Sequence, residues 1–464
     1  MQGREIVVVG HGAAGLSAAL SAAEAARDRG VAARITLIER ASEDSWGGNS
    51  RWSPSYIQMQ SADAVAPGFE EDIARQSRGR GDAGYFRRLA IEAAPTIGWL
   101  KRHGVEFHRP VYYLSAGPAR IQPVGGGVAL TQALLEAVKK AGVSIFYGRS
   151  AERLVSGGHG EISGVRLESS ETMAADVVIL ASGGFAGNGE MLREHFGPGA
   201  ENMRPISPGT RFNTGVGIRM ALGAGARRSG DWNGMHAEPV DARSQASAPV
   251  VLVYPYGIVV DRDGRRIFDE GGGLVHETWE AFARQIHFSA PGRVVYAILD
   301  SSLHDIPDYG RAIRSEIAPF VADTIAELAS ILGIAAAALE ETVHAYNRAA
   351  AGNATGFDAS RVDGLATAAG YAPRKSNWAR PLGRPPYLAW PLVGAIAYTF
   401  GGIETNPEAQ VLGADGPIRG LYAAGEITGH FYGTAPNAVA LLRALVFGRI
   451  AGLNAVLASI RVTQ

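Results

Sequence analysis

The sequence contains no cysteine and has no excess of either charge. Among its 464 residues, 44 Lys and Arg stand against 45 Asp and Glu, which leaves a formal net charge of −1. Without cysteine, this chain can supply no disulfide, thiolate metal ligand, iron–sulfur ligand or catalytic thiol. Without a basic excess, it lacks the electrostatic signature of nucleic-acid-binding proteins, so we expect no nucleic-acid partner.

Long hydrophobic runs are also missing. No apolar stretch reaches the roughly 18 uninterrupted residues that a membrane-spanning helix requires. The chain opens Met-Gln-Gly-Arg-Glu and enters an apolar stretch at Ile6, which is not the pattern of a signal peptide. We therefore expect no membrane span and a cytoplasmic location.

Glycine and apolar residues are abundant instead. The chain has 60 glycines, and 46% of its residues are hydrophobic, so it can bury a sizeable core and is not disordered. Near both ends, short apolar strands alternate with glycine turns and helices, a pattern that predicts an α/β fold. From about 235 to 385 the loops lengthen and aromatic residues scatter, which predicts an inserted second domain.

The first motif, near the N-terminus, is a strand, a glycine turn, a helix and a second strand. An apolar strand at 6–9 runs into G-x-G-x-x-G, an alanine-rich helix follows at 14–29, and the next strand at 35–38 ends in an acid. The glycines let the backbone approach a pyrophosphate, whose charge the helix N-terminus stabilises, and the acid can accept hydrogen bonds from ribose hydroxyls. This context predicts a dinucleotide site, FAD or NAD, at Gly10, Gly12, Ala14, Gly15, Glu39 and Arg40.

Three further small-residue segments extend the prediction. The segment Trp46-Gly47-Gly48-Asn49-Ser50-Arg51 can lie against a flat ring, with backbone N–H groups or the Ser50 hydroxyl reaching a ring nitrogen. Buried-strand patterns at 178–185 and 420–426 each end in a glycine turn, and an acid in the second can bind ribityl hydroxyls. The additional candidate cofactor residues are Gly47, Gly48, Asn49, Ser50, Ala181, Gly183, Gly184, Gly425, Glu426, Pro436 and Asn437.

With these motifs in this order, the sequence resembles the FAD-dependent flavoproteins of the succinate dehydrogenase/fumarate reductase superfamily over essentially the whole chain. Four stretches, 47–51, 264–271, 398–402 and 425–449, are most similar to the tricarballylate dehydrogenase-like branch. The resemblance implies an α/β protein with a Rossmann-like (GR2-type) FAD-binding domain at 1–230 and 386–464. An α+β capping domain would be inserted at 231–385.

The resemblance also implies the chemistry. In this superfamily a hydride moves between the flavin N5 and one substrate carbon, while a proton moves at the neighbouring carbon. An arginine of the capping domain carries that proton, and Arg284 occupies a similar place here. A histidine at the cap entry, matched by His236, would hydrogen-bond a carboxylate or carbonyl of the substrate.

Two positions depart from the fumarate reductase pattern. Tyr398 stands where those enzymes carry a carboxylate-binding histidine, and the loop at 432–437 lacks their arginine. A site that grips two carboxylates is therefore not expected. Tyr398 and Tyr432 become candidate catalytic bases, because a phenolate stabilised by arginine or histidine can abstract a proton next to a carbonyl. Tyr254 and Tyr256 are further candidates on the cap side.

We therefore expect an FAD-dependent dehydrogenase (desaturase) that oxidises a C–C single bond next to a carbonyl or carboxylate of a small polycarboxylate or cyclic keto-acid. Three alternatives stay open: a 3-ketosteroid Δ1-dehydrogenase-like enzyme, a fumarate reductase-like alkene reductase, and a non-catalytic FAD-binding module. Residues 41–46 contain no histidine or cysteine where related proteins attach the flavin, so we expect non-covalent FAD. No haem, iron–sulfur or other metal motif is present, so electrons would pass to a separate acceptor.

Overall fold

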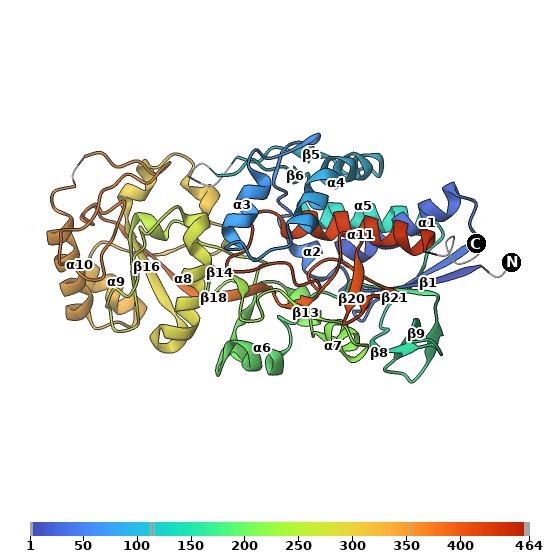
Figure 1. The fold of residues 1–464 in the computed structure, drawn as a ribbon. Helices are drawn as coiled ribbons and strands as arrows, with labels where there is room; N and C mark the ends of the chain where they lie inside the picture. The colour runs from blue at the N-terminus through green and yellow to red at the C-terminus, as the bar shows by residue number, and fades with distance from the viewer. Residues whose placement is uncertain (1–2, 112–113, 115–116, 354, 459–464) are drawn as a thin grey trace.

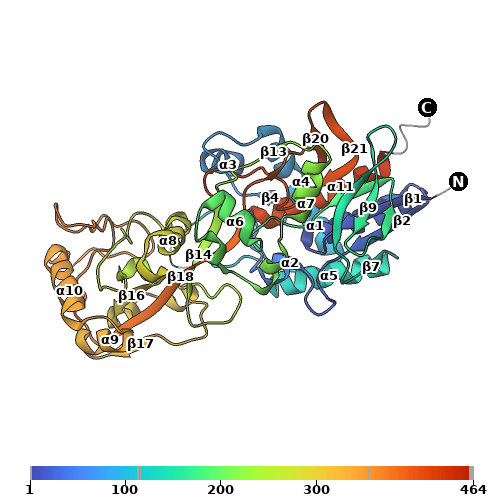
Figure 2. The same ribbon diagram turned by 90° about the horizontal axis from the view of Figure 1, so that it is seen from below.

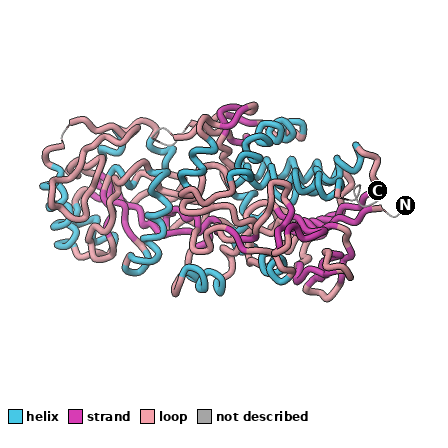
Figure 3. Tube along the Cα trace, viewed as in Figure 1, coloured by secondary structure: helices cyan, strands magenta, loops and turns pink. Residues whose placement is uncertain are grey.

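The computed structural model describes residues 3–111, 114, 117–353 and 355–458. It has two parts that lie side by side along the long axis of the molecule (Figure 1). One part contains both ends of the described chain, and the other is built from the middle of the chain. Most strands form a band along the middle of the molecule, and further short strands lie apart from it at the top and at the lower right (Figure 3).

The N-terminal motif folds as predicted, into β1 (Arg4–Val9), α1 (Ala13–Asp28) and β2 (Ala33–Ile38). These strands belong to a six-stranded sheet of order β20-β21-β11-β1-β2-β7. Its other members are β7 (Ser144–Phe146), β11 (Val177–Leu180), β20 (Gln410–Gly413) and β21 (Gly416–Ala423). All neighbours in this sheet are parallel except β20 and β21, so the carboxyl ends of β1, β2, β11 and β21 meet at one edge.

Helices α1, α5 (Gly126–Lys140) and α11 (Ala440–Leu457) cover one face of this sheet, with α4 (Ala83–Arg102) beyond them (Figure 1). The backbones of α1 and α11 approach closely: a Cβ added at Gly448 would lie 2.4 Å from the Ala14 carbonyl oxygen, and one at Gly452 would lie 2.1 Å from that of Ala18. Within the described residues, α11 is the one helix long and apolar enough to cross a membrane. However, 61% of it is buried inside the protein.

The opposite face carries α7 (Val216–Gly223) and a small antiparallel sheet of β8 (Ala151–Ser156), β9 (Ile162–Leu167) and β10 (Thr172–Ala174). Both lie below the main sheet in Figure 1. The remaining short elements are α3 (Phe69–Gln76), α6 (Gly189–Phe196), β3 (Met59–Ser61), β4 (Ala64–Val65), β5 (Phe107–His108), β6 (Gln122–Pro123), β13 (Arg228–Ser229) and β19 (Gly402–Ile403).

The second part, the cap, is built around one long strand, β18 (Tyr387–Thr399). It pairs with β12 (Arg204–Pro205), β14 (Met235–Asp241), β16 (Val295–Asp300) and β17 (Phe320–Ala322), and β15 (Ile258–Val260) pairs with β16. Helices α8 (Val275–Ser289), α9 (Ile325–Leu332) and α10 (Ala336–Ala350) pack around this sheet.

β18 lies in the segment 386–464 that the sequence assigned to the FAD-binding domain, yet it is the central strand of the cap sheet. Figure 2 shows it running out of the cap toward the other part of the molecule. The difference has a simple cause, since an apolar strand pattern does not say which of two sheets will pair with it.

Glycines shape two local features. In the cap, Gly333 (φ +68°) ends α9 in a left-handed cap, so α9 and α10 are separate helices. The small-residue segment at 46–51 leads into the short helix α2 (Gly48–Trp52) after Gly47 (φ +101°).

Candidate active site

A cleft opens at the carboxyl edge of the six-stranded sheet, where α/β proteins bind ligands. Its floor is the turn from β1 into α1, which packs tightly. A Cβ added at Gly10 (φ +109°) would lie 2.4 Å from the Ala181 carbonyl oxygen, and one at Gly15 would lie 1.8 Å from that of Gly10. Only glycine fits at both positions, so the turn brings the end of β11 against the start of α1.

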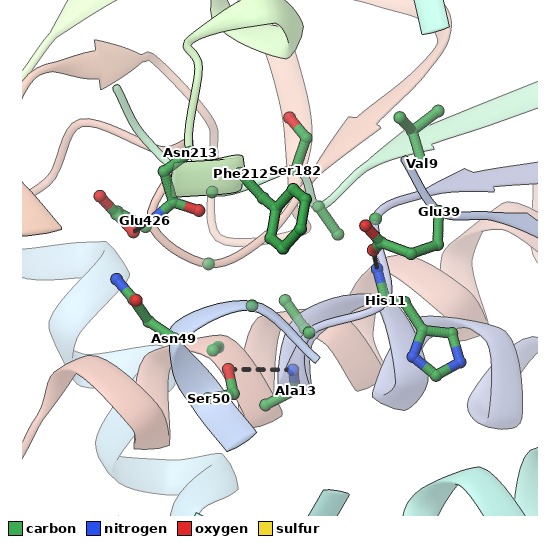
Figure 4. Close-up of a pocket in the computed structure, with 18 of the residues that line it drawn as sticks. Val9, His11, Ala13, Glu39, Asn49, Ser50, Ser182, Phe212, Asn213 and Glu426 are labelled. Atoms are coloured by element: carbon green, nitrogen blue, oxygen red, sulfur yellow. Dashed lines mark hydrogen bonds between the residues drawn. The ribbon is translucent and has the colours of Figure 1, made fainter. Parts of the chain in front are cut away.

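Glu39, at the end of β2, lies at one end of this cleft (Figure 4). Its carboxylate accepts hydrogen bonds from the backbone N–H groups of His11 (2.8 Å) and Ala41 (2.7 Å). Burial raises the pKa of Glu39 although these bonds act in the other direction. The carboxylate is thus fixed beside the glycine turn, where the motif predicts a ribose-binding acid.

The N-terminus of α1 has neither an acidic residue in its first turn nor a side-chain cap at Gly12. Ser50 of α2 accepts a hydrogen bond from the Ala13 N–H at 3.1 Å (Figure 4), which leaves its own O–H able to donate to a ring nitrogen, as expected of it. Arg40, which lines the same cavity, donates to the hydroxyl of Thr214. The helix end therefore offers a positive dipole to an anion, with the neutral hydroxyl of Ser50 beside it.

Glu426 lies at the other end of the cleft in Figure 4. Its carboxylate accepts hydrogen bonds from Asn213 Nδ2 and from the Thr399 N–H, both at 3.1 Å, and burial raises its pKa to about 7. Asn49 completes this end: its Nδ2 donates to the Ala397 carbonyl at 2.7 Å, and its Oδ1 accepts from Ser207 at 2.8 Å. These bonds join α2 and the end of β21 to the last residues of β18.

The structure brings most of the predicted cofactor residues to this one cavity, which has an empty volume of about 1170 Å³. Gly15, Gly47 and Gly184 do not line it but adjoin residues that do, and Pro436 and Asn437 line a second cavity described below. The predicted residues on its wall are Gly10, Gly12, Ala14, Glu39, Arg40, Gly48, Asn49, Ser50, Ala181, Gly183, Gly425 and Glu426.

Sequence reasoning missed several wall residues, among them His11, Asn213 and Arg443. Arg443 had a visible signal, because it is a charged residue inside the apolar helix α11. Its side chain is 1% exposed, and its Nη1 donates to the Thr428 carbonyl at 3.1 Å. Its guanidinium lies 3.9 Å from the ring of Phe431. This places a buried cation near Tyr398 and Glu426.

A second cavity, with an empty volume of about 990 Å³, lies between the cap and the part that holds the six-stranded sheet. We call it the cap cavity. It shares part of its wall with the first cavity, namely Asn49, Ser53, Tyr398, Ala440 and Leu441. A molecule in the cap cavity would therefore adjoin a cofactor in the cleft. Its wall also includes Trp52, Tyr56, Arg120, His236, Glu238, His276, Trp279 and Arg314.

His236, on β14, lies on the cap-cavity wall between two carboxylates. Its Nδ1 is 2.9 Å from Glu280 and its Nε2 is 3.2 Å from Glu238. Burial alone would lower the pKa of His236, but its hydrogen bonds with the two carboxylates and their charges raise it to about 9. His236 is thus protonated at neutral pH.

Tyr398 also lies on this wall, at the end of β18. Burial, aided by the charge of Glu280, raises the pKa of Tyr398 far above its usual range, although the positive charge of Arg443 acts in the other direction. We expected the neighbours of Tyr398 to stabilise its phenolate, but burial and the charge of Glu280 favour the neutral phenol. Tyr398 is placed as a hydrogen-bond donor, and its expected role as a base is not favoured.

The other candidate catalytic residues are not brought to this wall. Among the lining residues that the structure describes, neither cavity includes Arg284 or Tyr432. Arg284 lies on α8 one turn beyond Glu280 and donates to the Asn233 carbonyl at 3.4 Å. The Tyr432 hydroxyl accepts from the Gly230 N–H at 3.0 Å, with Arg80 5.0 Å from its ring. The spacing of residues along the chain does not show which turn of α8 lies at the cavity.

Tyr254 and Tyr256 are likewise buried in the apolar core of the cap. The hydroxyl of Tyr254 lies 3.4 Å from that of Thr278, and the Tyr256 hydroxyl donates to the Ala359 carbonyl at 3.0 Å. Burial raises the pKa of both tyrosines. Their contacts are those of structural core residues.

The chain belongs to the FAD binding domain family, which matches residues 5–439. It is 29% identical over 476 residues to the "Probable fumarate reductase Ifc3" of Shewanella frigidimarina, with 97% of this chain and 74% of that protein covered. It is 27% identical to the vinyl phenol reductase of Lactiplantibacillus plantarum, with 97% of this chain and 96% of that protein covered.

Solved structures agree with this assignment. The open conformation of a flavocytochrome c3 fumarate reductase has a TM-score of 0.77 and 26% identity, covering 99% of this chain and 79% of that one. A 3-ketosteroid Δ1-dehydrogenase of Sterolibacterium denitrificans shares the fold, with a TM-score of 0.73 at 20% identity over 98% of this chain and all of that one.

These findings confirm the succinate dehydrogenase/fumarate reductase superfamily, the α/β fold with its FAD-binding domain, and FAD as the cofactor. The chain is an FAD-dependent oxidoreductase acting on CH–CH groups, so the non-catalytic alternative is set aside. The assignment to the tricarballylate dehydrogenase-like branch stays a prediction.

The residues of the cleft fit FAD. The close-packed turn at Gly10 and Gly15 brings backbone to where a pyrophosphate would lie. Glu39 would hold the adenosine ribose, and Glu426 with Asn213 would face the ribityl chain. At the flavin end, Gly48 (φ +51°) leaves open space, since no atom lies within 4 Å of an added Cβ. Within the described residues, no group of three or more His, Asp and Glu side chains could hold a metal ion.

Proposed function

We propose that this enzyme interconverts a C–C single bond and a C=C double bond next to a carbonyl or carboxylate, on a small or cyclic acid bound in the cap cavity. Desaturation, the direction predicted from the sequence, and alkene reduction are the two directions of this reaction. One observation carries the proposal. His236 and Tyr398 line the cap cavity, and Tyr398 lies on the wall that it shares with the cofactor cleft.

Bound FAD supplies the hydride acceptor or donor. The residues of the chain handle the proton and the geometry. Glu280 lies outside the described cavity wall and engages Nδ1 of His236, which turns Nε2 toward Glu238 on the wall. When Nε2 leaves Glu238 for the substrate, protonated His236 can give a proton to the carbon next to the activating carbonyl, and neutral His236 can take one from it. Tyr398, held as a phenol, can donate a hydrogen bond to the carbonyl oxygen.

The protonation of His236 supports reduction as the direction at neutral pH. With a pKa of about 9, its ring carries the proton that alkene reduction consumes. The two curated relatives described above are named as reductases, which supports the same direction. Desaturation, which needs the neutral ring, is the second candidate and is favoured at alkaline pH.

We also propose that FAD is held without a covalent bond and that a separate donor or acceptor exchanges electrons with it. The first point is supported by the residues at 41–46, where neither histidine nor cysteine is present. The second is supported by the absence of cysteine from the chain, which therefore cannot ligate an iron–sulfur cluster through thiolates.

The test is anaerobic flavin spectroscopy of the purified holoenzyme. Dithionite-reduced enzyme is mixed with alkenes (fumarate, an aryl acrylate, a cyclohexenone carboxylate and a 3-keto-Δ1-steroid), and oxidised enzyme with their saturated counterparts. We expect one class to reoxidise reduced flavin at pH 7 and its saturated counterpart to bleach oxidised flavin faster at pH 9.5. A flavin that no activated alkene or saturated counterpart oxidises or reduces at either pH would refute the proposal.

A further inference from the structure

Two arginines from different parts of the molecule meet on one tyrosine in the cap cavity. Arg120 is 3% exposed, and its guanidinium carbon lies 3.8 Å from the centre of the Tyr56 ring. Arg314 donates from Nη2 to the Tyr56 hydroxyl at 2.7 Å, with its guanidinium carbon 5.5 Å from the same ring centre. Tyr56 thus holds both cations on the wall of one cavity.

The backbone fixes this arrangement. Ile57 and Ile121 pair through two hydrogen bonds of 2.9 Å, which places Arg120 beside Tyr56. In the cap, the Arg314 N–H donates to the Val250 carbonyl at 2.8 Å, next to the pairing of Val251 with Ile313. Each arginine is therefore anchored by its own domain, and the pair exists only where the two domains meet.

The arginines and the cofactor cleft meet the cap cavity through different residues. Tyr56 and Arg314 also border a more open depression at the surface, together with Trp52, Ser53 and Pro54. Of the residues that the structure describes, the wall shared with the cofactor cleft is made by Asn49, Ser53, Tyr398, Ala440 and Leu441, and it includes neither arginine. A ligand group held by the arginines therefore contacts other residues than the group that meets the flavin.

The acids on this side of the cavity pair with the histidine. Glu238 and Glu280 both contact the His236 ring. Burial would raise the pKa of Glu238, but the hydrogen bond with His236 and the charges of His236 and Arg314 lower it. Arg120 and Arg314 bring two further positive charges to the cavity wall.

The cap cavity also has aromatic and apolar residues on its wall. Trp52, Trp279 and Ile206 line it together with Pro54 and Pro436. Such a wall favours a ring over a short polar chain.

We propose that Arg120 and Arg314 together bind the carboxylate of a cyclic keto-acid, with its ring between the tryptophans and its ketone at Tyr398 and His236. The carboxylate serves recognition, and the ketone activates the reacting C–C bond. Paired guanidinium groups suit this task, because each can donate two parallel hydrogen bonds to a carboxylate. This deepens the proposed function by naming the substrate class, and it rests on that function only for the reacting end.

The test compares an acid with its ester. Oxidised holoenzyme is titrated with 3-(4-oxocyclohexyl)propanoate and with its methyl ester, and binding is read from the flavin absorbance shift under anaerobic conditions. We expect Arg314→Gln to weaken binding of the acid at least tenfold and binding of the ester less than twofold. Raising the salt concentration should weaken binding of the acid alone. Arg311→Gln is the matched control, because Arg311 is exposed, pairs with Asp308 and lies in the same cap segment.

Equal losses for acid and ester in Arg314→Gln, or no loss for either, would overturn the arginine proposal, as would tighter binding of succinate than of the keto-acid. Arg314→Lys guards against a folding defect, since it keeps the charge and should retain more of the discrimination than the glutamine variant. The results distinguish the two proposals. If an acid binds in an Arg314-dependent way but never reduces the flavin, the arginine proposal stands and the proposed redox function is wrong. If substrates are turned over but acid and ester bind equally, the redox function stands and the arginine proposal is wrong.

Discussion

The imidazole of His236 and the ring of Tyr398 lie 4.9 Å apart between centres, inclined at 33°. His236 comes from β14 and Tyr398 from β18, and the two residues are register partners in the cap sheet. The contact therefore places a protonated histidine and a neutral phenol side by side on the cap-cavity wall. Tyr398 can donate its hydroxyl hydrogen to a ligand oxygen that gains negative charge during the reaction, and the positive charge of His236, whose ring nitrogens face Glu238 and Glu280, stabilises that charge.

The first prediction concerns the proton on His236. His236→Gln removes the proton donor while keeping a hydrogen-bonding side chain, and it should slow alkene reduction at pH 7 by about 100-fold or more. Wild-type reduction should decline as the pH rises through about 9, while desaturation should increase over the same range. Stopped-flow rates of flavin oxidation and reduction from pH 6 to 10.5 give both profiles. A pH dependence unchanged in the variant would assign the proton to another group.

The second prediction concerns stability. The pKa of His236 is raised from 6.5 to about 9 in the folded protein, so its contribution to stability is fully present below pH 6.5 and is lost as the pH rises through 9. Glu280→Gln removes one of the two carboxylates responsible. The variant should therefore be less stable than wild type at pH 6, and the difference should shrink by pH 10. Thermal unfolding of both proteins at the two pH values checks this, because contributions of other titrating groups cancel in the difference.

The third prediction concerns FAD binding. Glu39→Ala should weaken FAD affinity by about 10- to 100-fold, the range expected when a buried charged hydrogen-bonding group is lost. The measurement is the FAD dissociation constant from fluorescence titration of the apoprotein. Glu43→Ala is the control, since Glu43 is exposed four residues further along the chain. Equal affinities in the two variants would rule out the assignment of Glu39 to the ribose.

The fourth prediction concerns whether Arg284 takes part in turnover. Arg284 matches the proton-carrying arginine of the superfamily by its place in the chain, but its guanidinium reaches the Asn233 carbonyl at 3.4 Å. We therefore expect Arg284→Lys to keep turnover within about threefold of wild type, the scale of a lost weak surface hydrogen bond. A loss of 100-fold or more, with FAD still bound, would show that the side chain swings into the cavity during turnover.

The fifth prediction concerns packing of α11 on α1. Gly452→Ala would place a methyl group 2.1 Å from the Ala18 carbonyl oxygen, so the helices must separate. Overpacking of this kind costs about 1–3 kcal/mol of unfolding free energy. Gly223→Ala is the control, because nothing lies within 4 Å of an added Cβ there. Chemical denaturation should show destabilisation in the first variant and little change in the second.

The sequence predicted the FAD-binding part well because its signals are local. A strand, a glycine turn and an acid at a fixed distance determine where Gly10, Gly15 and Glu39 lie relative to one another. The cap cavity was harder to predict, because its wall combines residues from distant segments. Arg120 and Arg314 are 194 positions apart, and nothing in either local sequence indicates that both reach Tyr56.

The candidate bases illustrate the same limit. The sequence identified Tyr398 as a site residue, and the structure places it on the cavity wall. Its ionisation depends on Glu280 and Arg443, which reach it through the fold rather than through the chain. A pattern of residue types could therefore locate the tyrosine but could not determine its protonation state.

β18 mechanically couples the cap to the flavin site. Seven of its last eight residues pair with β14, and its final residue, Thr399, donates its N–H to Glu426 at 3.1 Å. A hinge motion of the cap must therefore either bend this strand near its end or break the Thr399–Glu426 bond. In both cases Tyr398 is displaced from the shared wall. Opening the cap to admit a substrate would disassemble part of the reaction site, and closing it would restore that part.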